Sequence, residues 1–496
     1  MEDRLGPVNA PDILDLVDNA DRRVALRDGG RSVSYEDLGA SVRTLAGALV
    51  RRGVTTGDRV AVSLPNVAAA VEVYLACALI GAIWVGVNPN APAAERDRQC
   101  DVVDPTLIVC NPSGPPRWNG RRVADLTDLA ADPNSSFDAT PPPLMTACAI
   151  GFSSGTTGTP KAVVHSRAGV SLSAAVLADV QLRRDDRIGV ILPMSIHNLI
   201  VVAALSAMFA GATCIPVERM NAEGVAAACA EYQLTKLNAL VPATIYDLVH
   251  DTTITPQALS TLRFASTGAA GLSEHLRGAF EEKFGLRLIG SYGMTEAPGA
   301  VAIETPDEPH LEGASGRSLP HLRIDATDGR GRRLLARRTG ELVVSAREDG
   351  AWAGRYRPAM GTWSTAGLHL RPPVEPALRT GDVGWVDDDG TVHVTGRQAE
   401  VILRGGVNVN AAELEAVLVR LPDVRDVAVI GVPDERLGQR IVAFVESMAE
   451  TQLDPAELRT RAREVLSHGK VPDDVVIGTL PRNAMGKVVR GQLTIP

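Results

Sequence analysis

Near the start of the chain, segments with apolar residues at helical spacing alternate with short apolar runs. Residues 38–52 carry apolar side chains at helical spacing, and residues 59–63 form a short apolar run that is typical of a buried strand. A helix over 68–80 and a strand over 84–87 repeat this succession. The alternation predicts parallel βαβ units with helices on both faces of a sheet.

The same alternation resumes in the middle third of the chain. Further strands are expected at 190–192, 212–217, 237–241, 264–265 and 286–288. After Gly313 the apolar runs are shorter and are separated by Gly and Asp turns, which is typical of an antiparallel sheet. The expected fold class is therefore α/β: a large N-terminal domain of stacked α/β subdomains plus a distorted β-barrel, with a small α+β C-terminal domain.

The boundary of the second domain is expected near residue 396. Residues 387–390, Asp-Asp-Asp-Gly, predict a hairpin turn just before it. Beyond it the pattern predicts helices and strands at 411–420, 427–431, 441–446 and 455–468. We therefore expect an N-terminal domain over 1–396 and a C-terminal domain over 397–496.

Composition excludes several classes of function. At 496 residues the chain is long enough for at least two domains with their own cores. The formal net charge of −9 argues against nonspecific nucleic-acid binding and provides no basic patch for anionic lipids. The cysteines lack the paired spacing of a metal cluster, so we expect buried free thiols in a reducing cytoplasm. They are Cys77, Cys100, Cys110, Cys148, Cys214 and Cys229.

One uncharged run, 199–217, is long enough to be a membrane-spanning candidate. Gly211 divides it into a helix-like half and a strand-like half, and a buried helix–strand pair accounts for both halves. Residues 1–18 are acidic and interrupted by proline, so they lack the features of a signal peptide. We therefore expect no membrane insertion.

The strongest chemical signal is the segment 150–161, Ile-Gly-Phe-Ser-Ser-Gly-Thr-Thr-Gly-Thr-Pro-Lys. Glycines allow the backbone to approach an anion closely, hydroxyls and N–H groups donate hydrogen bonds, and lysine adds positive charge. This combination suits a polyphosphate, although its spacing differs from that of the common nucleotide hydrolases. A plain Gly/Ser surface loop is the alternative.

Residues 153–161 resemble the phosphate loop of the AMP-forming adenylating enzymes. That superfamily includes acyl-CoA synthetases, adenylation domains of nonribosomal peptide synthetases and firefly luciferase. Three further segments match the family in the same order, between about Ser291 and Arg490, so the resemblance covers most of the chain. It implies that ATP contacts Ser153, Ser154, Gly155, Thr156, Thr157, Gly158 and Lys161.

The segment 290–296, Gly-Ser-Tyr-Gly-Met-Thr-Glu, is similar to the second nucleotide motif of the family. The resemblance implies that Tyr292 stacks on adenine, Thr295 bonds the α-phosphate and Glu296 helps to hold Mg²⁺, a hard cation that prefers carboxylate oxygen. An ordinary turn is the alternative. Other nucleotide contacts implied here are Ser291, Gly293 and the upstream small residues Gly268, Ala269 and Ala270.

Two later segments complete the nucleotide site by resemblance. Residues 380–382 resemble the segment whose aspartate, here Asp382, binds the ribose hydroxyls, and Arg397 then donates to ribose or phosphate. Residues 480–490 resemble the last family motif, which places Lys487 beside the α-phosphate and the attacking carboxylate. Its charge there offsets the repulsion between two anions. The alternatives are a simple turn and a solvated lysine.

The family also implies that the small domain is mobile and rotates between two half-reactions. The chain departs from the family pattern at this point, since Ala399 replaces the usual aspartate or lysine of the hinge. Asn410 and Ala411 replace the usual tyrosine and proline. These departures weaken the case for rotation and thioester formation, but they do not affect adenylation.

The implied reaction is attack of a carboxylate on ATP, which gives acyl-AMP and pyrophosphate, followed by transfer of the acyl group to a thiol. Residues 432–439 look like the acyl-CoA synthetase branch, so coenzyme A is the first choice of acceptor. The alternatives are the pantetheine thiol of an acyl carrier protein, and a non-catalytic nucleotide-binding homologue. Retention of Lys487 and Glu296 speaks against the last. The oligomeric state is open, with a homodimer among the options.

Residues 192–198 match the family region that borders the acid pocket, where His197 either guides the carboxylate or is a structural histidine. No acidic residue lies between Asp186 and Glu218, so a substrate ammonium would lack a counter-charge and an α-amino acid is disfavoured. His197 with Asn198 resembles the aryl-acid activators. An aromatic or medium-chain acid is favoured, with room left by Gly268, Gly290, Ala297 and Gly299.

Overall fold

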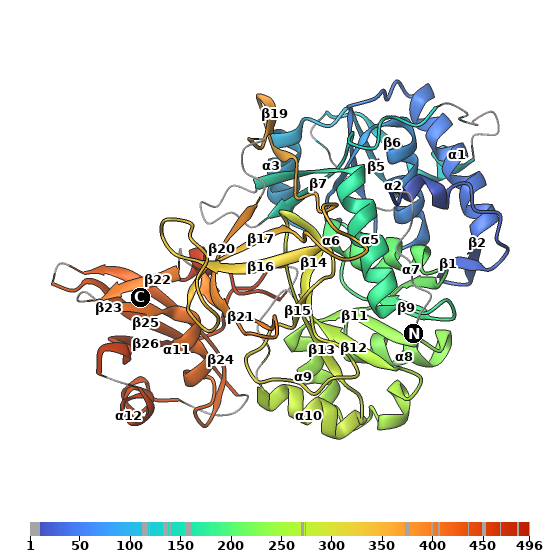
Figure 1. The fold of residues 1–496 in the computed structure, drawn as a ribbon. Helices are drawn as coiled ribbons and strands as arrows, with labels where there is room; N and C mark the ends of the chain where they lie inside the picture. The colour runs from blue at the N-terminus through green and yellow to red at the C-terminus, as the bar shows by residue number, and fades with distance from the viewer. Residues whose placement is uncertain are drawn as a thin grey trace.

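A computed structural model describes most of the chain. The described residues are 10–111, 118, 120–131, 137, 140–153, 161–268, 272, 274–372, 377–397, 400–404, 407–434, 436–448, 453–466, 468–483 and 486–495. They form a large lobe that ends with β21 (Val392–Arg397) and a small lobe that begins at residue 400. The small lobe, orange to red in Figure 1, lies on one side of the large lobe.

A first sheet of mainly parallel strands runs through the large lobe in the order β15-β14-β13-β12-β11-β9-β10-β1-β2. Neighbours from β1 to β13 are parallel, whereas β2, β14 and β15 add antiparallel edges. Its strands are β1 (Val24–Asp28), β2 (Arg31–Ser34), β9 (Arg187–Val190), β10 (Thr213–Pro216), β11 (Lys236–Leu240), β12 (Phe264–Thr267), β13 (Leu288–Met294), β14 (Ala297–Ile303) and β15 (Arg317–Ser318).

The second sheet has the order β19-β18-β8-β7-β4-β3-β5-β6. It is parallel from β7 to β6, and β8 and β18 extend it in the antiparallel sense. Its strands are β3 (Arg59–Ser63), β4 (Ile83–Gly86), β5 (Leu107–Cys110), β6 (Val123–Asp125), β7 (Ala147–Ser153), β8 (Lys161–Ser166), β18 (Gly361–Ser364) and β19 (Gly367–Leu370).

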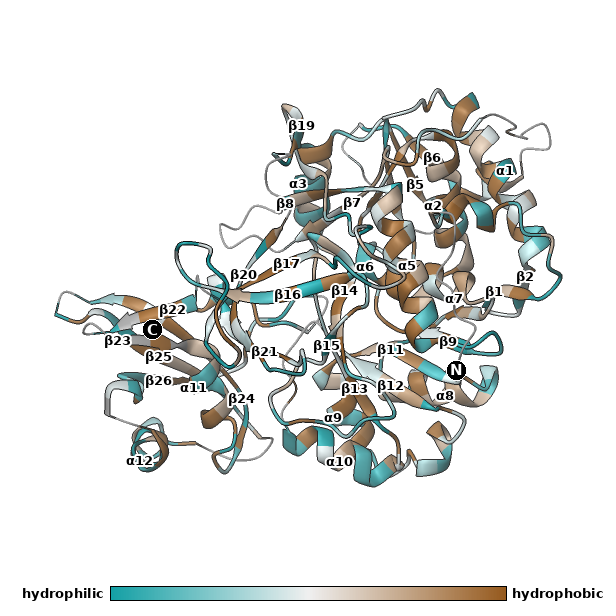
Figure 2. Cartoon of the chain, viewed as in Figure 1, coloured by the Kyte–Doolittle hydropathy of each residue, from teal (hydrophilic) through white to brown (hydrophobic). Residues whose placement is uncertain are grey.

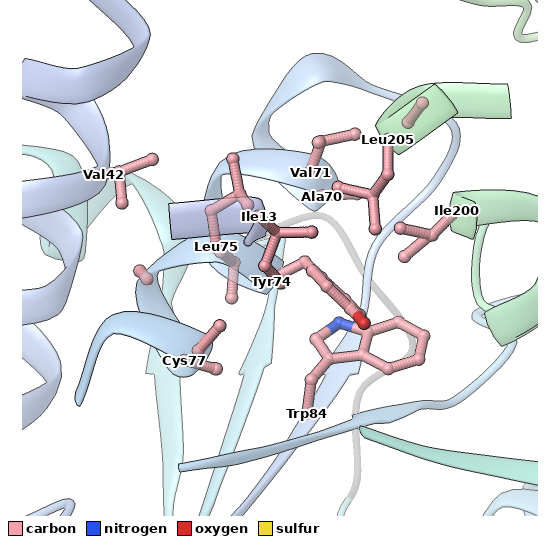
Figure 3. Close-up of a cluster of buried hydrophobic side chains, with 14 of the residues drawn as sticks. Ile13, Val42, Ala70, Val71, Tyr74, Leu75, Cys77, Trp84, Ile200 and Leu205 are labelled. Carbon is pink, nitrogen blue, oxygen red and sulfur yellow. The ribbon is translucent and has the colours of Figure 1, made fainter. Parts of the chain in front are cut away.

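A continuous hydrophobic core joins the two sheets through the helices between them. It contains Leu26 and Ile188 of the first sheet and Val60 and Val109 of the second. The helices of this layer are α1 (Tyr35–Arg51), α2 (Ala68–Ile80), α5 (Arg167–Gln181) and α7 (Ser206–Phe209), with the 3₁₀ turn Ile13–Leu16. Figure 3 shows part of this core around Tyr74 and Trp84. The α/β layering predicted from the alternating pattern is confirmed.

Local sequence explains where these helices begin and end. The Ser34 hydroxyl accepts a hydrogen bond from the Asp37 amide at the start of α1, and Gly81, at φ +75°, ends α2 in the left-handed region. α2 is buried all round because it lies between the sheets, which explains its uninterrupted apolar run. Its one charge, Glu72, is buried and forms a two-pronged ion pair with Arg31 at 2.7 and 2.9 Å.

Other helices cover the outer faces of the sheets. A second core packs α8, α9 and α10 on the outside of the first sheet. Figure 2 shows the mainly hydrophobic central strands in brown and hydrophilic residues in teal on outer helices such as α10. The outer helices are α3 (Ala93–Val103), α8 (Ala222–Tyr232), α9 (Pro242–His250) and α10 (Glu274–Phe284), with the 3₁₀ turn Pro256–Leu259, whereas α4 (Leu126–Ala130) packs on α1.

The uncharged run 199–217 is a buried helix–strand pair, as expected. It begins in α6 (His197–Leu199) and continues through a π-helical segment, Ile200–Leu205, into α7 and then β10. In the described part of the chain, no helix combines the length and apolarity needed to cross a membrane. The predicted cysteine state is also confirmed, because all six thiols are free and buried.

The remaining elements are antiparallel sheets. The large lobe ends in the sheet β16-β17-β20-β21, and the small lobe is built on β23-β22-β25-β24 with β26 beside β25. α11 and α12 complete the core of the small lobe. Their bounds are β16 (Leu322–Thr327), β17 (Gly340–Ala346), β20 (Leu378–Val386), β22 (Val401–Arg404), β23 (Val407–Asn410), β24 (Val424–Asp434), β25 (Gly438–Ser447), β26 (Asp474–Ile477), α11 (Ala411–Leu418) and α12 (Pro455–Val465), with 3₁₀ turns His468–Lys470 and Arg490–Gln492.

Candidate active site

The predicted phosphate loop connects two antiparallel strands of the second sheet. Ser153, at the end of β7, faces Lys161, at the start of β8. β7 continues a parallel sheet, so this connection lies at the carboxyl edge, where ligands commonly bind in α/β folds. The loop residues predicted to bind phosphate, Ser154, Gly155, Thr156, Thr157 and Gly158, lie outside the described residues.

Lys161 contacts the predicted magnesium ligand directly. Its Nζ lies 3.0 Å from Oε1 of Glu296, with half of the lysine side chain exposed. Thr295 and Glu296 form the two-residue turn of the hairpin between β13 and β14, because Met294 pairs with Ala297. The hairpin therefore presents the hydroxyl and the carboxylate at its tip, beside the strand that follows the phosphate loop.

The backbone packs tightly at one glycine beside this turn. A Cβ built on Gly151 of β7 would lie 3.2 Å from Cγ2 of Thr295 and 3.1 Å from Cβ of His197. Both distances are tighter than almost all real Cβ contacts. The second sheet, the Thr295 turn and the His197 segment thus meet at Gly151.

Tyr292, Asp382 and Arg397 form a connected group. The Tyr292 hydroxyl donates to Oδ2 of Asp382 at 2.5 Å, and Nε of Arg397 lies 3.1 Å from Oδ1. Asp382 and Arg397 are direct partners across the β20–β21 ladder, whereas Tyr292 comes from β13 of the first sheet. Burial raises the pKa of the Asp382 carboxyl, although the Tyr292 hydrogen bond and the Arg397 charge oppose this. Burial and Asp382 together raise the pKa of Tyr292.

Lys487 of the small lobe is affected by the charges of this group. Burial lowers the pKa of its ammonium, and Arg397 lowers it further, while the charges of Glu400 and Asp382 act in the opposite direction. The Lys487 amide donates to Oδ1 of Asn483 at 3.0 Å, and the Asn483 amide donates back to the Lys487 carbonyl at 2.9 Å. A tight turn thus fixes the backbone at the lysine.

His197 lies in a buried aromatic group. Its Nε2 is 3.2 Å from the Tyr74 hydroxyl, and its ring stacks on His165 with centroids 4.6 Å apart and planes at 16°. Burial lowers the pKa of His197 well below its usual range, and the neighbouring His165 adds to the effect. Both imidazoles are therefore neutral at neutral pH, and the pKa of His165 is lowered by burial to about 4.

His165 and Tyr74 are site neighbours that the sequence reasoning did not identify. His165 is a polar residue at a fully buried position of β8, the strand that begins at Lys161. A histidine inside an otherwise apolar strand next to the phosphate segment is the signal that marks it. Tyr74 carries no such signal, because it lies in the continuous apolar run of α2.

The Asn198 amide forms hydrogen bonds to the protein backbone. Its Nδ2 donates to the carbonyls of Met294 and Gly299 at 3.0 and 3.2 Å, and its Oδ1 accepts from the Gly299 amide at 3.3 Å. The side chain therefore holds the β13–β14 hairpin that carries Thr295 and Glu296.

The small residues predicted for the pocket are closely packed in the direction in which a Cβ would project. A Cβ on Gly299 would meet Leu177, Val201 and Ser173 within 3.5 Å. A Cβ on Gly290 would meet the Glu304 carboxylate at 2.8 Å, and one on Gly268 would meet Oγ of Ser291 at 2.6 Å. Ala297 is buried. Packing fills these positions, because each strand edge has a neighbour that sequence spacing does not reveal.

The structure places the other predicted residues as follows. Ser291 lies in β13, where its hydroxyl donates to the Thr267 carbonyl at 3.1 Å. Gly293 follows Tyr292 in the same strand, at the irregular point of the hairpin register. Ala269, Ala270 and the hinge residue Ala399 lie outside the described residues. The structure thus brings together Lys161 with Glu296, and Tyr292 with Asp382 and Arg397.

Two family models match the chain. The family model described as AMP-binding enzyme matches residues 16–348, and the model described as AMP-binding enzyme C-terminal domain matches residues 413–487. Together they span both lobes and include Lys161, Tyr292 and Lys487.

Individual relatives extend the comparison along nearly the whole chain. An indoleacetate–CoA ligase from Aromatoleum aromaticum is 30% identical over 490 residues, which cover 94% of this chain and 93% of that protein. A sulfoacetate–CoA ligase from Cupriavidus necator is 31% identical over 487 residues, with the same coverage. ATP-bound MatB from Rhodopseudomonas palustris superposes with a TM-score of 0.86 at 26% identity, over 98% of each chain, and its apo form gives 0.75.

Proposed function

The chain belongs to the AMP-binding enzyme family as an acid–thiol ligase of the acyl-CoA synthetase type, and we propose that it uses ATP to join a carboxylic acid to coenzyme A. The observation that carries the proposal is the group of Tyr292, Asp382 and Arg397, in which the Tyr292 hydroxyl lies 2.5 Å from Oδ2 of Asp382 and Nε of Arg397 lies 3.1 Å from Oδ1. This group places an aromatic ring, a carboxylate and a guanidinium around one position.

In the first half-reaction, a carboxylate oxygen attacks the α-phosphorus of ATP while the bond to pyrophosphate breaks, which gives acyl-AMP. We assign Lys487 to the approach of the two anions, because a partly buried ammonium offsets their repulsion. Thr295 is assigned to the α-phosphate, and His197, which is neutral, to the carboxylate end of the acid. In the second half-reaction, the thiol of coenzyme A attacks the acyl carbon and AMP leaves.

The nucleotide is assigned to the group around Tyr292. Its ring would stack on adenine, and Asp382 would accept from the ribose hydroxyls while Arg397 remains beside it. Phosphates would lie along the loop 153–161. Glu296 suits a single Mg²⁺ ion that arrives with ATP, since this ion commonly uses one or two carboxylates with phosphate oxygens and water. In the described residues, no cluster of three or more acidic, histidine or cysteine side chains forms a separate metal site.

For the acid we propose an aromatic or medium-chain carboxylate. Burial keeps His197 uncharged, and residues 187–217 contain no carboxylate that could pair with a substrate ammonium. Two relatives whose names specify indoleacetate and sulfoacetate indicate that the family accepts quite different acids. Because Gly290 and Gly299 are packed, space for the acid is proposed to come from other positions.

We assign residues 1–396 to the nucleotide and acid sites and residues 397–496 to a lid that brings Lys487. The superposition with ATP-bound MatB, better than that with its apo form, supports placing this structure in the arrangement for adenylation. Six buried free thiols support a cytoplasmic location. The alternative acceptor is the pantetheine thiol of a carrier protein.

A panel of carboxylic acids tests the proposal. Each acid is incubated with enzyme, ATP and Mg²⁺, and ATP–pyrophosphate exchange is measured with and without coenzyme A. We expect exchange with at least one aromatic or medium-chain acid, and thioester formation when coenzyme A is added. Exchange without thioester would favour the carrier-protein alternative, whereas bound nucleotide without exchange for any acid would favour a non-catalytic homologue.

A further inference from the structure

The two lobes touch at a place separate from the nucleotide residues. Arg425, at the start of β24, holds its guanidinium carbon 5.2 Å from the ring centroid of Tyr246 on α9. Nearby, Nη2 of Arg420 lies 2.8 Å from Oε1 of Glu312 in the large lobe. Figure 1 shows β24 on the side of the small lobe that faces α9 and α10. Two arginines of the small lobe therefore rest on two residues of the large lobe.

The Tyr246 ring is also held by a contact within its own lobe. His250, one turn later in α9, stacks on it with centroids 3.9 Å apart and planes at 23°. Nδ1 of His250 also lies 2.8 Å from the Tyr246 carbonyl. A guanidinium over a tyrosine face is attracted by the negative face of the ring, so the pair fixes both distance and orientation.

Arg425 is connected by ion pairs to the loop that carries the lysine. Its Nη1 lies 3.3 Å from Oε1 of Glu446, and the other oxygen of this carboxylate lies 3.0 Å from Nη2 of Arg482. Nη1 of Arg482 donates to the carbonyl of Gly486 at 3.1 Å. The next residue after Gly486 is Lys487. A continuous path of charged contacts thus runs from Tyr246 to the backbone beside the lysine.

We propose that Tyr246 and Glu312 are positioning residues: they dock Arg425 and Arg420 of the small lobe, and the path through Glu446 and Arg482 transmits this docking to the Lys487 loop. None of these residues is assigned to substrate. Their effect is confined to the step in which Lys487 acts, which is acyl-AMP formation. The inference rests on the proposed function for that step.

Variants of Tyr246 provide the first test. Tyr246→Leu removes the ring, and we expect ATP–pyrophosphate exchange to fall by about fivefold in kcat with little change in KM for ATP. Tyr246→Phe keeps the ring face and should restore the wild-type rate. Thioester formation from supplied acyl-AMP should be equal in all three proteins. Equal exchange in the leucine and phenylalanine variants, or equal loss in both half-reactions, contradicts the proposal.

Reversal of the second contact provides an independent test. Glu312→Arg and Arg420→Glu each place like charges together, so each should slow exchange, and the double variant should recover because the pair is restored in reverse. Arg463→Ala, an exposed arginine on α12, is the matched control and should leave exchange unchanged. Failure of the double variant to recover overturns the role of this contact.

A readout without catalysis separates this inference from the proposed function. Small-angle scattering with bound AMP reports how closely the lobes lie, whatever the acid substrate is. Tyr246→Leu should increase the mean size of the particle relative to Tyr246→Phe. If the wild-type enzyme fails every exchange assay yet shows this difference, the docking stands and the proposed reaction is wrong. If exchange occurs and neither readout distinguishes the two variants, the docking is wrong.

Discussion

Asp382 is a buried carboxylate that has partners from two different sheets. Burial disfavours its charged form, whereas the Tyr292 hydroxyl and the Arg397 guanidinium favour it. Lys161 and Glu296 are arranged in a similar way at the phosphate end, where each neutralises the other. The charged residues of the site are thus paired with one another. A polyphosphate with its cation would replace some of these ion pairs, so it would not enter a site of unpaired charges.

Lys487→Ala tests the assignment of the lysine. We expect acyl-AMP formation, measured by ATP–pyrophosphate exchange, to fall by about 100- to 1000-fold, because one preorganised charge at the reacting phosphate is lost. Nucleotide binding, followed by the shift in thermal unfolding with added ATP, should remain. Lys470→Ala, which removes another lysine of the same lobe, is the control. Near-normal exchange in the Lys487 variant would show that the assignment is wrong.

Tyr292→Phe separates the hydroxyl of this residue from its ring. The free energy of unfolding should fall by roughly 1–2 kcal/mol, because a hydrogen bond to a charged group is lost. The KM for ATP should stay within about threefold, because the face proposed to stack on adenine is retained. Chemical denaturation and initial rates measure the two effects. A large rise in KM with unchanged stability would place the hydroxyl, not the ring, in contact with nucleotide.

At the scale of elements, the β13–β14 hairpin fixes the turn that carries Thr295 and Glu296. Met294 and Ala297 pair directly, so the register fixes the positions of Thr295 and Glu296 in the turn. Asn198 of α6 donates hydrogen bonds to both strands of the hairpin. The segment that follows Asn198 is π-helical over Ile200–Leu205. Wider turns of this kind often occur at functional sites.

Asn198→Ala should affect the turn more than the acid. The substitution leaves backbone groups of Met294 and Gly299 without a partner, so we expect a loss of about 1–3 kcal/mol in the free energy of unfolding. The kcat for exchange should fall as the Thr295–Glu296 turn is displaced, with little change in KM for the acid. A variant with normal stability and a selective rise in acid KM would restore Asn198 to the substrate pocket.

Many of the helices and strands could be predicted from the sequence. The bounds of α2 and β3 agree with the predicted ranges, because a continuous apolar run between Pro, Gly and polar residues has few other solutions. The contacts of Asn198 could not be predicted, since its partners lie about 100 residues away in a different element. The same reason applies to Gly299, whose apparent spare room is filled by side chains from α5 and the π-helical segment.

At the scale of the whole molecule, burial of histidines links stability to pH. His165, His197 and His321 are almost completely buried, and burial lowers the pKa of each, to about 4 for His165 and about 3 for His321. In the unfolded chain, histidines bind protons near pH 6.5. Between these values the unfolded state binds more protons than the folded state, so the free energy of unfolding falls as the pH falls.

His165→Phe should make this pH dependence less steep. Each buried histidine contributes up to about 1.4 kcal/mol per pH unit in this range, and phenylalanine removes one such contribution while it keeps a ring against His197. Urea denaturation at pH 7, 6, 5 and 4.5 measures the slope. His275→Gln, at an exposed position of α10, is the control and should follow the wild type. If the free energy of unfolding changes with pH in parallel for the His165 variant and the wild type, burial of His165 does not contribute to the pH dependence.

Natural selection at Asn198 acts on two roles of this residue at once. Asn198 is the next residue after His197, which is assigned to the acid substrate. Its side chain also holds the turn that carries Thr295 and Glu296. Under the proposed assignments, a mutation at this position that reshapes the acid side would also displace the turn of Thr295 and Glu296, whichever acid is the substrate. Lineages that acquire new acids are expected to change other walls of the site and to inherit this asparagine.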